Sequence, residues 1–70
     1  MRILYDDQRH LVTEPYSVEN LHRAAKQLGI KRCWFHKDHY DIPKRMVARM
    51  SETVAEKVSP REILKLVRGK

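Results

Sequence analysis

The sequence predicts one small α/β domain with the order β-α-β-α-β-α and a short, mostly parallel, three-stranded sheet. Three observations support this prediction. Short β-prone apolar runs alternate with amphipathic segments, two of the predicted helices begin with clear capping signals, and a length of 70 residues suits a single domain. We therefore expect residues 1–70 to form one compact unit with a thin core.

The first half of the chain predicts a strand, a loop and a helix. Arg2–Tyr5 is β-prone, and the polar stretch Asp7–Pro15 is expected to be a long loop. Ser17 is a good N-cap, and Gly29 suits the position after the last helical residue. One helical face collects the apolar residues Val18, Leu21, Ala24, Ala25 and Leu28.

A second strand is expected over Lys31–His36. The spacing strand–helix–strand is that of a βαβ unit, whose two strands run parallel. Pro43 then suits the start of a second helix with Met46 and Met50 on its inner face, and Asp41 or its neighbour is the expected cap.

The stretch Ser51–Val58 fits either a continuation of the second helix or a short strand. We favour a strand over Ala55–Val58, because a third helix restarts abruptly after it. Ser59 and Glu62 are placed as a capping box, with proline at the first helical position between them.

The amino-acid composition indicates a cellular compartment and the kinds of partner that the chain could bind. The net charge is +6, from 15 Lys and Arg against 9 Asp and Glu. This charge attracts nucleic acid or another polyanion, but it fits plain solubility equally well. The single cysteine, Cys33, excludes an internal disulfide and a cysteine-rich zinc knuckle. Both points favour a reducing, cytoplasmic setting. Because the chain has no apolar run of membrane-spanning length, we expect no membrane partner.

Two polar clusters, each after an apolar run, mark the expected site. Asp6, Asp7 and His10 follow one run, and the segment His36–Asp41 follows the other. In a parallel sheet both strand ends open on one edge, beside helix N-termini that favour anions. We therefore expect the two clusters to converge there on a phosphate-bearing ligand.

Each residue type suggests a role at this site. The catalytic candidates are Asp6, Asp7 and His39. Carboxylates and imidazoles suit a divalent metal, although no cofactor is specified, and the candidate ligands are Asp6, Asp7, His36 and His39. Further ligand-binding candidates are Arg9, His10, His36, Tyr40 and Asp41. The same side chains also have ordinary uses as helix caps, turn residues and ion pairs, and for Asp41 the cap is the favoured reading.

Basic side chains gather on the second and third predicted helices. The nucleic-acid-binding candidates are Lys44, Arg45, Arg49, Arg61, Lys65 and Arg68. Contacts with phosphates need no more than such faces, while base-specific readout is not indicated. A merely solvated helix face explains the same pattern.

Several short motifs together are similar to a known family. They are Tyr5-Asp6-Asp7 with Arg9-His10, then Trp34-Phe35, His39-Tyr40-Asp41 and Ser59-Pro60-Arg61-Glu62. The chain resembles, nearly end to end, the small bacterial and phage family catalogued as domain of unknown function 4031. The resemblance implies a compact α/β domain and no particular activity. Val54-Ala55 departs from the Gly-Ala expected before the last strand.

Three functional hypotheses follow. The leading one is binding or processing of a nucleic acid or phosphate-bearing ligand at the Asp/His cluster. The first alternative is a non-catalytic nucleic-acid-binding module that uses the basic helices. The second is a small interaction protein, for which the resemblance implies a phage origin. It would bind and modulate a host protein through an exposed apolar patch, with Met46, Met50 or Trp34 as candidates. The sequence leaves the oligomeric state open.

Overall fold

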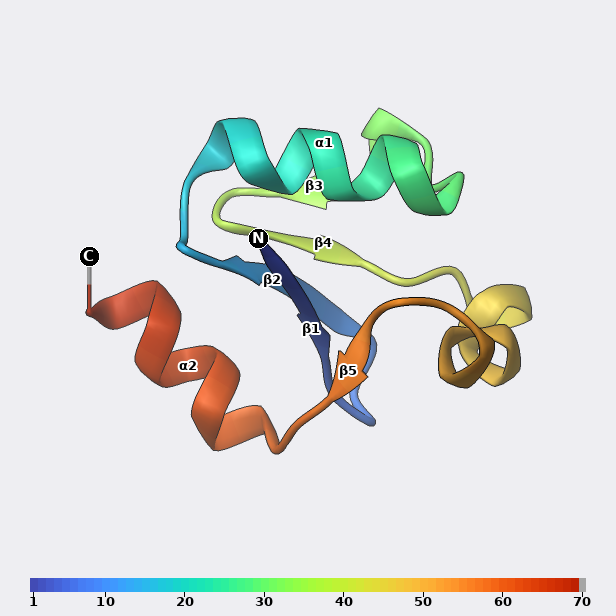
Figure 1. The fold of residues 1–70 in the computed structure, drawn as a ribbon. Coiled ribbons are helices and arrows are strands. Elements are labelled where there is room, and N and C mark those ends of the chain that lie inside the picture. The colour runs from blue at the N-terminus through green and yellow to red at the C-terminus, as the bar shows by residue number, and fades with distance from the viewer. Residues whose placement is uncertain (70) are drawn as a thin grey trace.

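A computed structural model of the chain describes residues 1–69 and shows a five-stranded mixed sheet with a helix on each face (Figure 1). The strand order is β3-β4-β2-β1-β5. The elements are β1 (Arg2–Tyr5), β2 (His10–Glu14), α1 (Val18–Leu28), the 3₁₀ helix η1 (Arg32–Trp34), β3 (Phe35–His36), β4 (His39–Asp41), the 3₁₀ helix η2 (Lys44–Glu52), β5 (Glu56–Lys57) and α2 (Pro60–Arg68).

The α/β class is confirmed, but the prediction of a three-stranded, mostly parallel sheet is wrong. Within residues 1–69, β1 and β5 pair in parallel, whereas β1–β2, β2–β4 and β3–β4 are antiparallel. The predicted loop over Asp7–Pro15 contains the central strand β2, whose residues Leu11, Val12 and Thr13 are fully buried. The predicted crossover therefore does not exist, because β2 lies between β1 and the second half of the sheet.

Two tight turns make this hairpin topology. Arg9 (φ 69°) ends the β1–β2 turn, and its N–H donates to the Asp6 carbonyl at 3.4 Å. Lys37 (φ 55°) lies between β3 and β4, where the Asp38 N–H donates to the His36 carbonyl at 2.6 Å. Both turn residues adopt the left-handed region, which is costly for a residue with a Cβ.

Helix α1 begins and ends where its capping signals predict, and α2 begins where its signals predict. The Ser17 hydroxyl accepts from the Asn20 N–H at 3.0 Å, and Gly29 ends α1 with φ 79°. The Ser59 hydroxyl accepts from the Glu62 N–H at 3.3 Å at the start of α2. These caps satisfy backbone donors that the first turn of a helix leaves without an intrahelical partner.

The middle of the chain departs from its prediction. Most of the expected strand Lys31–His36 is the short helix η1, and only its last two residues pair as β3. The expected second helix is η2, a 3₁₀ helix whose N-cap is Pro43. Asp41 is therefore not its cap, since it lies in β4. The expected last strand is present as the two residues of β5.

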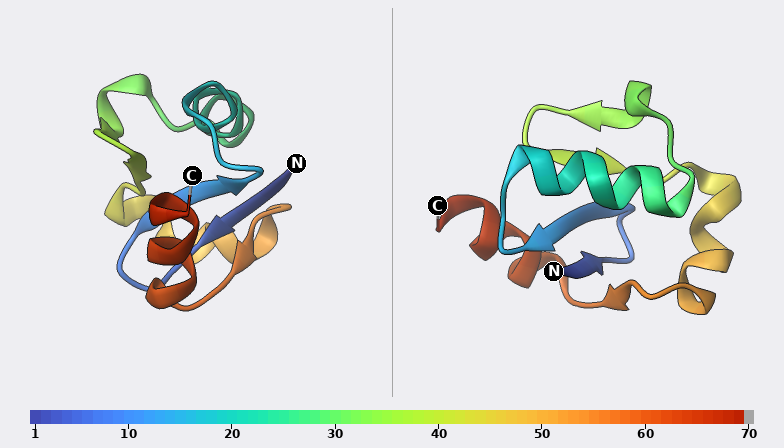
Figure 2. Two further views of the ribbon diagram at one scale, coloured as in Figure 1. Left: turned by 90° about the vertical axis from the view of Figure 1, so that its left-hand side faces the viewer. Right: turned by 45° about the horizontal axis from the view of Figure 1, so that its top comes forward.

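The two faces of the sheet carry different side chains, because successive residues of a strand point to opposite sides. Leu11 and Tyr40 are paired across β2 and β4, and they lie on the face that α1 covers. His10 and Asp41, the neighbouring pair, lie on the other face together with His39, and α2 packs on that side (Figure 2). In residues 1–69 no helix is long and apolar enough to cross a membrane.

Candidate histidine–aspartate site

Asp6 is a buried carboxylate that holds the β1–β2 turn and the ring of His10. Its Oδ1 accepts the backbone N–H groups of Gln8 at 3.0 Å and His10 at 2.9 Å. Its Oδ2 lies 2.9 Å from Nδ1 of His10, and the Asp6 side chain is fully buried. Since Nδ1 is engaged by Asp6, Nε2 is the nitrogen of His10 that remains for a ligand.

His39 is the first residue of β4, and its ring lies between the carboxylates of Asp38 and Asp41. Its Nδ1 is 2.8 Å from Asp38 Oδ1, and its Nε2 is 3.1 Å from Asp41 Oδ1. The hydrogen bond from His39 lowers the pKa of the Asp38 carboxyl below its ordinary value, although burial opposes this shift. The two strand residues before and after Tyr40 thus share one face and one network.

The two imidazoles meet edge to face across β2 and β4. Their ring centroids are 4.9 Å apart and their planes are perpendicular. Among residues 1–69, one group of side chains has the spacing of a metal centre: single ligand atoms of His10, His39 and Asp41 lie within 4.8 Å of one another. The antiparallel register explains this convergence, because it sets His10 opposite Asp41.

A hollow of about 320 Å³ opens over this cluster, and we call it the histidine hollow. Its lining residues are Gln8, His10, Asp38, His39, Pro60, Ile63, Leu64 and Val67. The sheet supplies the polar side, and α2 supplies the apolar side. Pro60 is the first residue of α2, so the positive end of the helix dipole lies at the hollow.

The structure brings together only part of the predicted metal and catalytic set. Asp6 is close to the cluster, but its oxygens are occupied by Gln8 and His10 and are buried. Asp7 is an exposed turn residue outside the group of ligand atoms. His36 is exposed, and its ring centroid is 5.6 Å from that of His39.

Two further ligand-binding candidates, Tyr40 and Arg9, do not belong to the histidine–aspartate cluster. Tyr40 is 1% exposed and lies on the opposite face, where its hydroxyl and Nδ1 of His22 are 2.6 Å apart. Burial raises the pKa of Tyr40. Arg9 forms the turn, and its carbonyl accepts the N–H of Ile42 at 2.8 Å, which ties the exit of β4 to the β1–β2 hairpin.

The basic candidates fall into two separate groups. The α2 group, Arg61, Lys65 and Arg68, lines a hollow of about 420 Å³ together with Leu64 and Gly69. The η2 group consists of the exposed residues Lys44, Arg45 and Arg49. The views in Figures 1 and 2 place α2 and η2 at opposite ends of the molecule, so these groups do not form one continuous surface.

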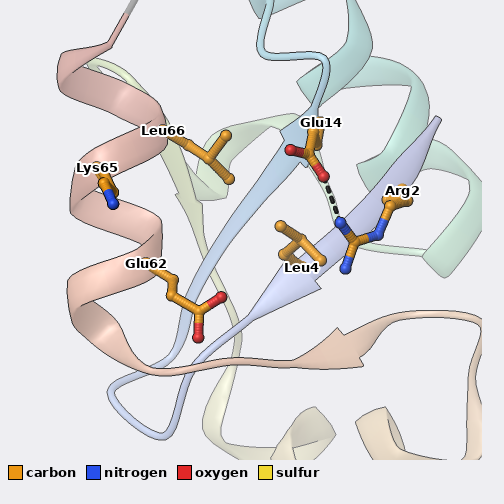
Figure 3. Close-up of a pocket in the computed structure, with 6 residues that line it drawn as sticks. All are labelled: Arg2, Leu4, Glu14, Glu62, Lys65 and Leu66. Atoms are coloured by element: carbon orange, nitrogen blue, oxygen red, sulfur yellow. Dashed lines mark hydrogen bonds and ion pairs between the residues drawn. The ribbon is translucent and has the colours of Figure 1, made fainter.

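A third hollow, of about 250 Å³, lies between α2 and the far ends of β1 and β2 (Figure 3). Arg2 crosses its rim, where it forms an ion pair with Glu14. A second ion pair joins Arg2 to Glu56 at 3.0 Å and lowers the pKa of the Glu56 carboxyl. Arg2, Glu14 and Glu56 thus have charged partners within the chain, and no imidazole lines this hollow.

Sequence reasoning missed two features of the site. Asp38 was not among the candidates, yet it contacts His39 and lines the histidine hollow. The hydroxyl of Tyr16 also donates to the Asp38 carbonyl at 2.6 Å. The apolar side of the hollow was missed as well. Leu64, which lines it, is 49% exposed. The alternation of polar residues around Tyr40 was the available signal for the shared face.

Comparisons with known proteins identify a family but no activity. Searches of curated proteins and of solved structures each returned no significant match. The profile of a family described as "Protein of unknown function (DUF4031)" matches residues 6–70, a range that includes the cluster and α2. The chain therefore belongs to the DUF4031 family.

Proposed function

We propose that this chain binds a nucleic acid, or a closely related phosphate-bearing ligand, across the histidine hollow and along the outer side of α2. One observation carries the proposal. Leu64 lines both the histidine hollow and the hollow formed by the α2 basic group, so the two hollows adjoin at this side chain. A strand whose phosphates follow the basic group would bring one nucleotide to the imidazoles.

The chemistry of the two hollows suits such a ligand. Arg61, Lys65 and Arg68 supply phosphate contacts, which need charge but no sequence-specific geometry. The N-terminus of α2 favours an anion beside His10. The apolar side of the histidine hollow, with Leu64 and Val67, offers a surface for a sugar or a base. Imidazoles oriented by carboxylates can transfer protons or bind a metal, and either chemistry would serve phosphodiester processing.

The α2 basic group adjoins the histidine hollow, whereas the η2 group lies apart from it, so we favour α2 as the binding element. Two variants that remove the same number of charges, one from each group, can therefore be compared. The triple variants Arg61→Gln/Lys65→Gln/Arg68→Gln and Lys44→Gln/Arg45→Gln/Arg49→Gln both lower the net charge by the same amount. Fluorescence anisotropy with a labelled single strand and a labelled duplex, over a range of salt concentrations, compares them with the parent.

We expect the α2 variant to bind at least tenfold more weakly than the parent. Its salt slope should also fall, by up to about 2–3 units, because three phosphate contacts are lost. The η2 variant should stay close to the parent. Equal losses in both variants would indicate a diffuse charge effect, which fits the non-catalytic module better. No binding by the parent at low salt would contradict the proposal.

A second candidate function is the binding of a host protein, which the 49% exposure of Leu64 favours. The apolar patch first expected for such a partner is reduced, since Met46 and Met50 are buried in the core, while Trp34 is 37% exposed. A protein partner that contacts α2 through Leu64 would bind the Leu64→Asp variant more weakly and would bind the α2 charge variant as tightly as the parent. A nucleic acid should instead bind the α2 charge variant more weakly.

A further inference from the structure

We propose that His10, His39 and Asp41 bind one divalent metal ion of the zinc class, and that this ion holds the phosphate in the histidine hollow. The ligand atoms of these three side chains lie within 4.8 Å of one another on two paired strands. The role of the ion toward phosphate rests on the proposed function, whereas the metal site itself can be tested without it.

Both histidines are oriented as metal ligands usually are. Nδ1 of His10 is 2.9 Å from Asp6, and Nδ1 of His39 is 2.8 Å from Asp38. A carboxylate behind a metal-binding imidazole fixes its tautomer and orientation and raises its basicity. Asp6 is especially firm support, because it is buried and also accepts two backbone N–H groups. This leaves Nε2 of His10 for the metal, whereas Nε2 of His39 faces Oδ1 of Asp41 at 3.1 Å, a contact that the ion would replace.

The spacing requires only a small adjustment. Four ligands at about 2.0–2.1 Å around a tetrahedral ion lie about 3.3 Å apart. Nε2 of His39 and Oδ1 of Asp41, at 3.1 Å, already match this spacing. The three ligand atoms lie within 4.8 Å of one another, so a shift of at most about 1.5 Å, which we assign to His10, gives the tetrahedral spacing. Its side chain is 35% exposed and that of Asp41 is 44% exposed, so both have room to move.

The charges of the cluster also call for a cation. Asp6, Asp38 and Asp41 bring three carboxylates to two imidazoles. With neutral imidazoles, such a cluster repels a phosphate. A divalent ion on three protein ligands offsets this charge and leaves a fourth position for a phosphate oxygen or for a water molecule. The ion would thus convert an acidic cluster into a phosphate site.

The test is isothermal titration calorimetry of the full chain with ZnCl₂ alone. We expect one site per chain in the parent. His10→Gln, His39→Gln and Asp41→Asn should each weaken it at least tenfold. The controls His36→Gln and Cys33→Ser change exposed side chains of ligand type outside the cluster and should stay within threefold of the parent. Circular dichroism spectra establish that each variant is folded.

Asp6→Asn separates a positioning role from a structural one. It should weaken zinc binding about 10–100-fold. It should also change the tautomer of His10, which the imidazole ¹⁵N shifts report. No stoichiometric zinc binding by the parent, or equal losses in the control variants, would overturn the metal site.

Anisotropy with and without a chelator separates this inference from the proposed function. Binding of an oligonucleotide that a chelator weakens at least tenfold supports the role of the ion. Zinc binding without any oligonucleotide binding keeps the metal site and removes the proposed function. Oligonucleotide binding that a chelator leaves unchanged keeps the proposed function and overturns the role of the ion.

Discussion

Asp6 and His10 form a carboxylate–imidazole pair in which the carboxylate is fully buried and the imidazole opens on a hollow. The distance from Oδ2 to Nδ1 is 2.9 Å, and Oδ1 accepts the backbone N–H groups of Gln8 and His10. One side chain therefore closes the β1–β2 turn and orients a ring of the candidate site. Asp6 therefore links the stability of the turn to the geometry of the candidate site.

The first prediction concerns this pair. Asp6→Ala leaves backbone donors of the turn and Nδ1 of His10 without their acceptor, so it should lower the free energy of unfolding by about 2–4 kcal/mol. Asp7→Ala, in the same turn but exposed, should stay within about 0.5 kcal/mol of the parent. Urea denaturation measures both variants. Similar midpoints for the two would contradict the role of Asp6.

The second prediction concerns the start of α2. The Ser59 hydroxyl accepts from the Glu62 N–H, whereas Glu62 itself lines the hollow of Figure 3. Ser59→Ala should cost about 1 kcal/mol. Glu62→Ala should cost only about 0.3–0.5 kcal/mol, because it removes a charge near the helix N-terminus rather than the cap. An equal cost for both changes, by thermal denaturation, would indicate a full reciprocal capping box.

The third prediction concerns acid stability. Arg2 donates to Glu56 and lowers the pKa of its carboxyl. A lowered folded-state pKa gives stability that is fully present above the unfolded value, about 4.3, and is lost as the pH falls through the folded value. Arg2→Gln should therefore be less stable than the parent at neutral pH and approach it below about pH 3.

The pair is exposed, so the difference should be small and should shrink with added salt. Denaturation midpoints of the parent and Arg2→Gln across this pH range provide the measurement. A constant difference at every pH would show that Arg2 acts through packing rather than through its charge.

The fourth prediction concerns Tyr40 and His22 on the α1 face. Tyr40→Phe removes a buried hydroxyl that lies 2.6 Å from His22 Nδ1, and it should cost about 1–2 kcal/mol. Burial raises the pKa of Tyr40, so the parent should lose stability as the pH rises above the unfolded phenol value, about 10. Tyr40→Phe should lose less over that range. Identical alkaline profiles would contradict the assignment.

The helices were predictable because their signals are local. Ser17 with Gly29, and Ser59 with Pro60, define helix ends through contacts within a few residues. Tertiary packing does not need to be known for such signals. The prediction of the family rests on residues spread along the chain, and the match over residues 6–70 confirms it.

The sheet was mispredicted because its hairpins lack the usual turn residues. Asn-Gly or a glycine at the left-handed position normally announces such a turn. Here Arg9 and Lys37 occupy left-handed positions instead. The β-prone segment Leu11–Thr13 was therefore included in a loop, and β4 was not recognised. The register of a hairpin depends on turn type and loop length, so it could not be assigned without recognising these turns.

Some residues of the two polar clusters lie close together as expected, but the strand pairing that brings them together differs from the prediction. His10 and His39 meet because β2 pairs antiparallel with β4, not because two parallel strands end at one edge. Because side chains alternate along β4, His39 and Asp41 lie on the sheet face of His10, whereas Tyr40 lies on the α1 face. These choices require the strand register and could not be made from composition.

The central claim, that a ligand binds at the histidine hollow, is tested most directly by the four histidine rings. Imidazole NMR signals of ¹³C,¹⁵N-labelled protein are followed while a short single-stranded oligonucleotide is added. The account predicts that His10 and His39 shift in proportion to binding, while His22, on the α1 face, stays unchanged and His36 shifts little. Saturable binding that perturbs His22 while the signals of His10 and His39 do not shift, or no binding at low salt, would contradict it.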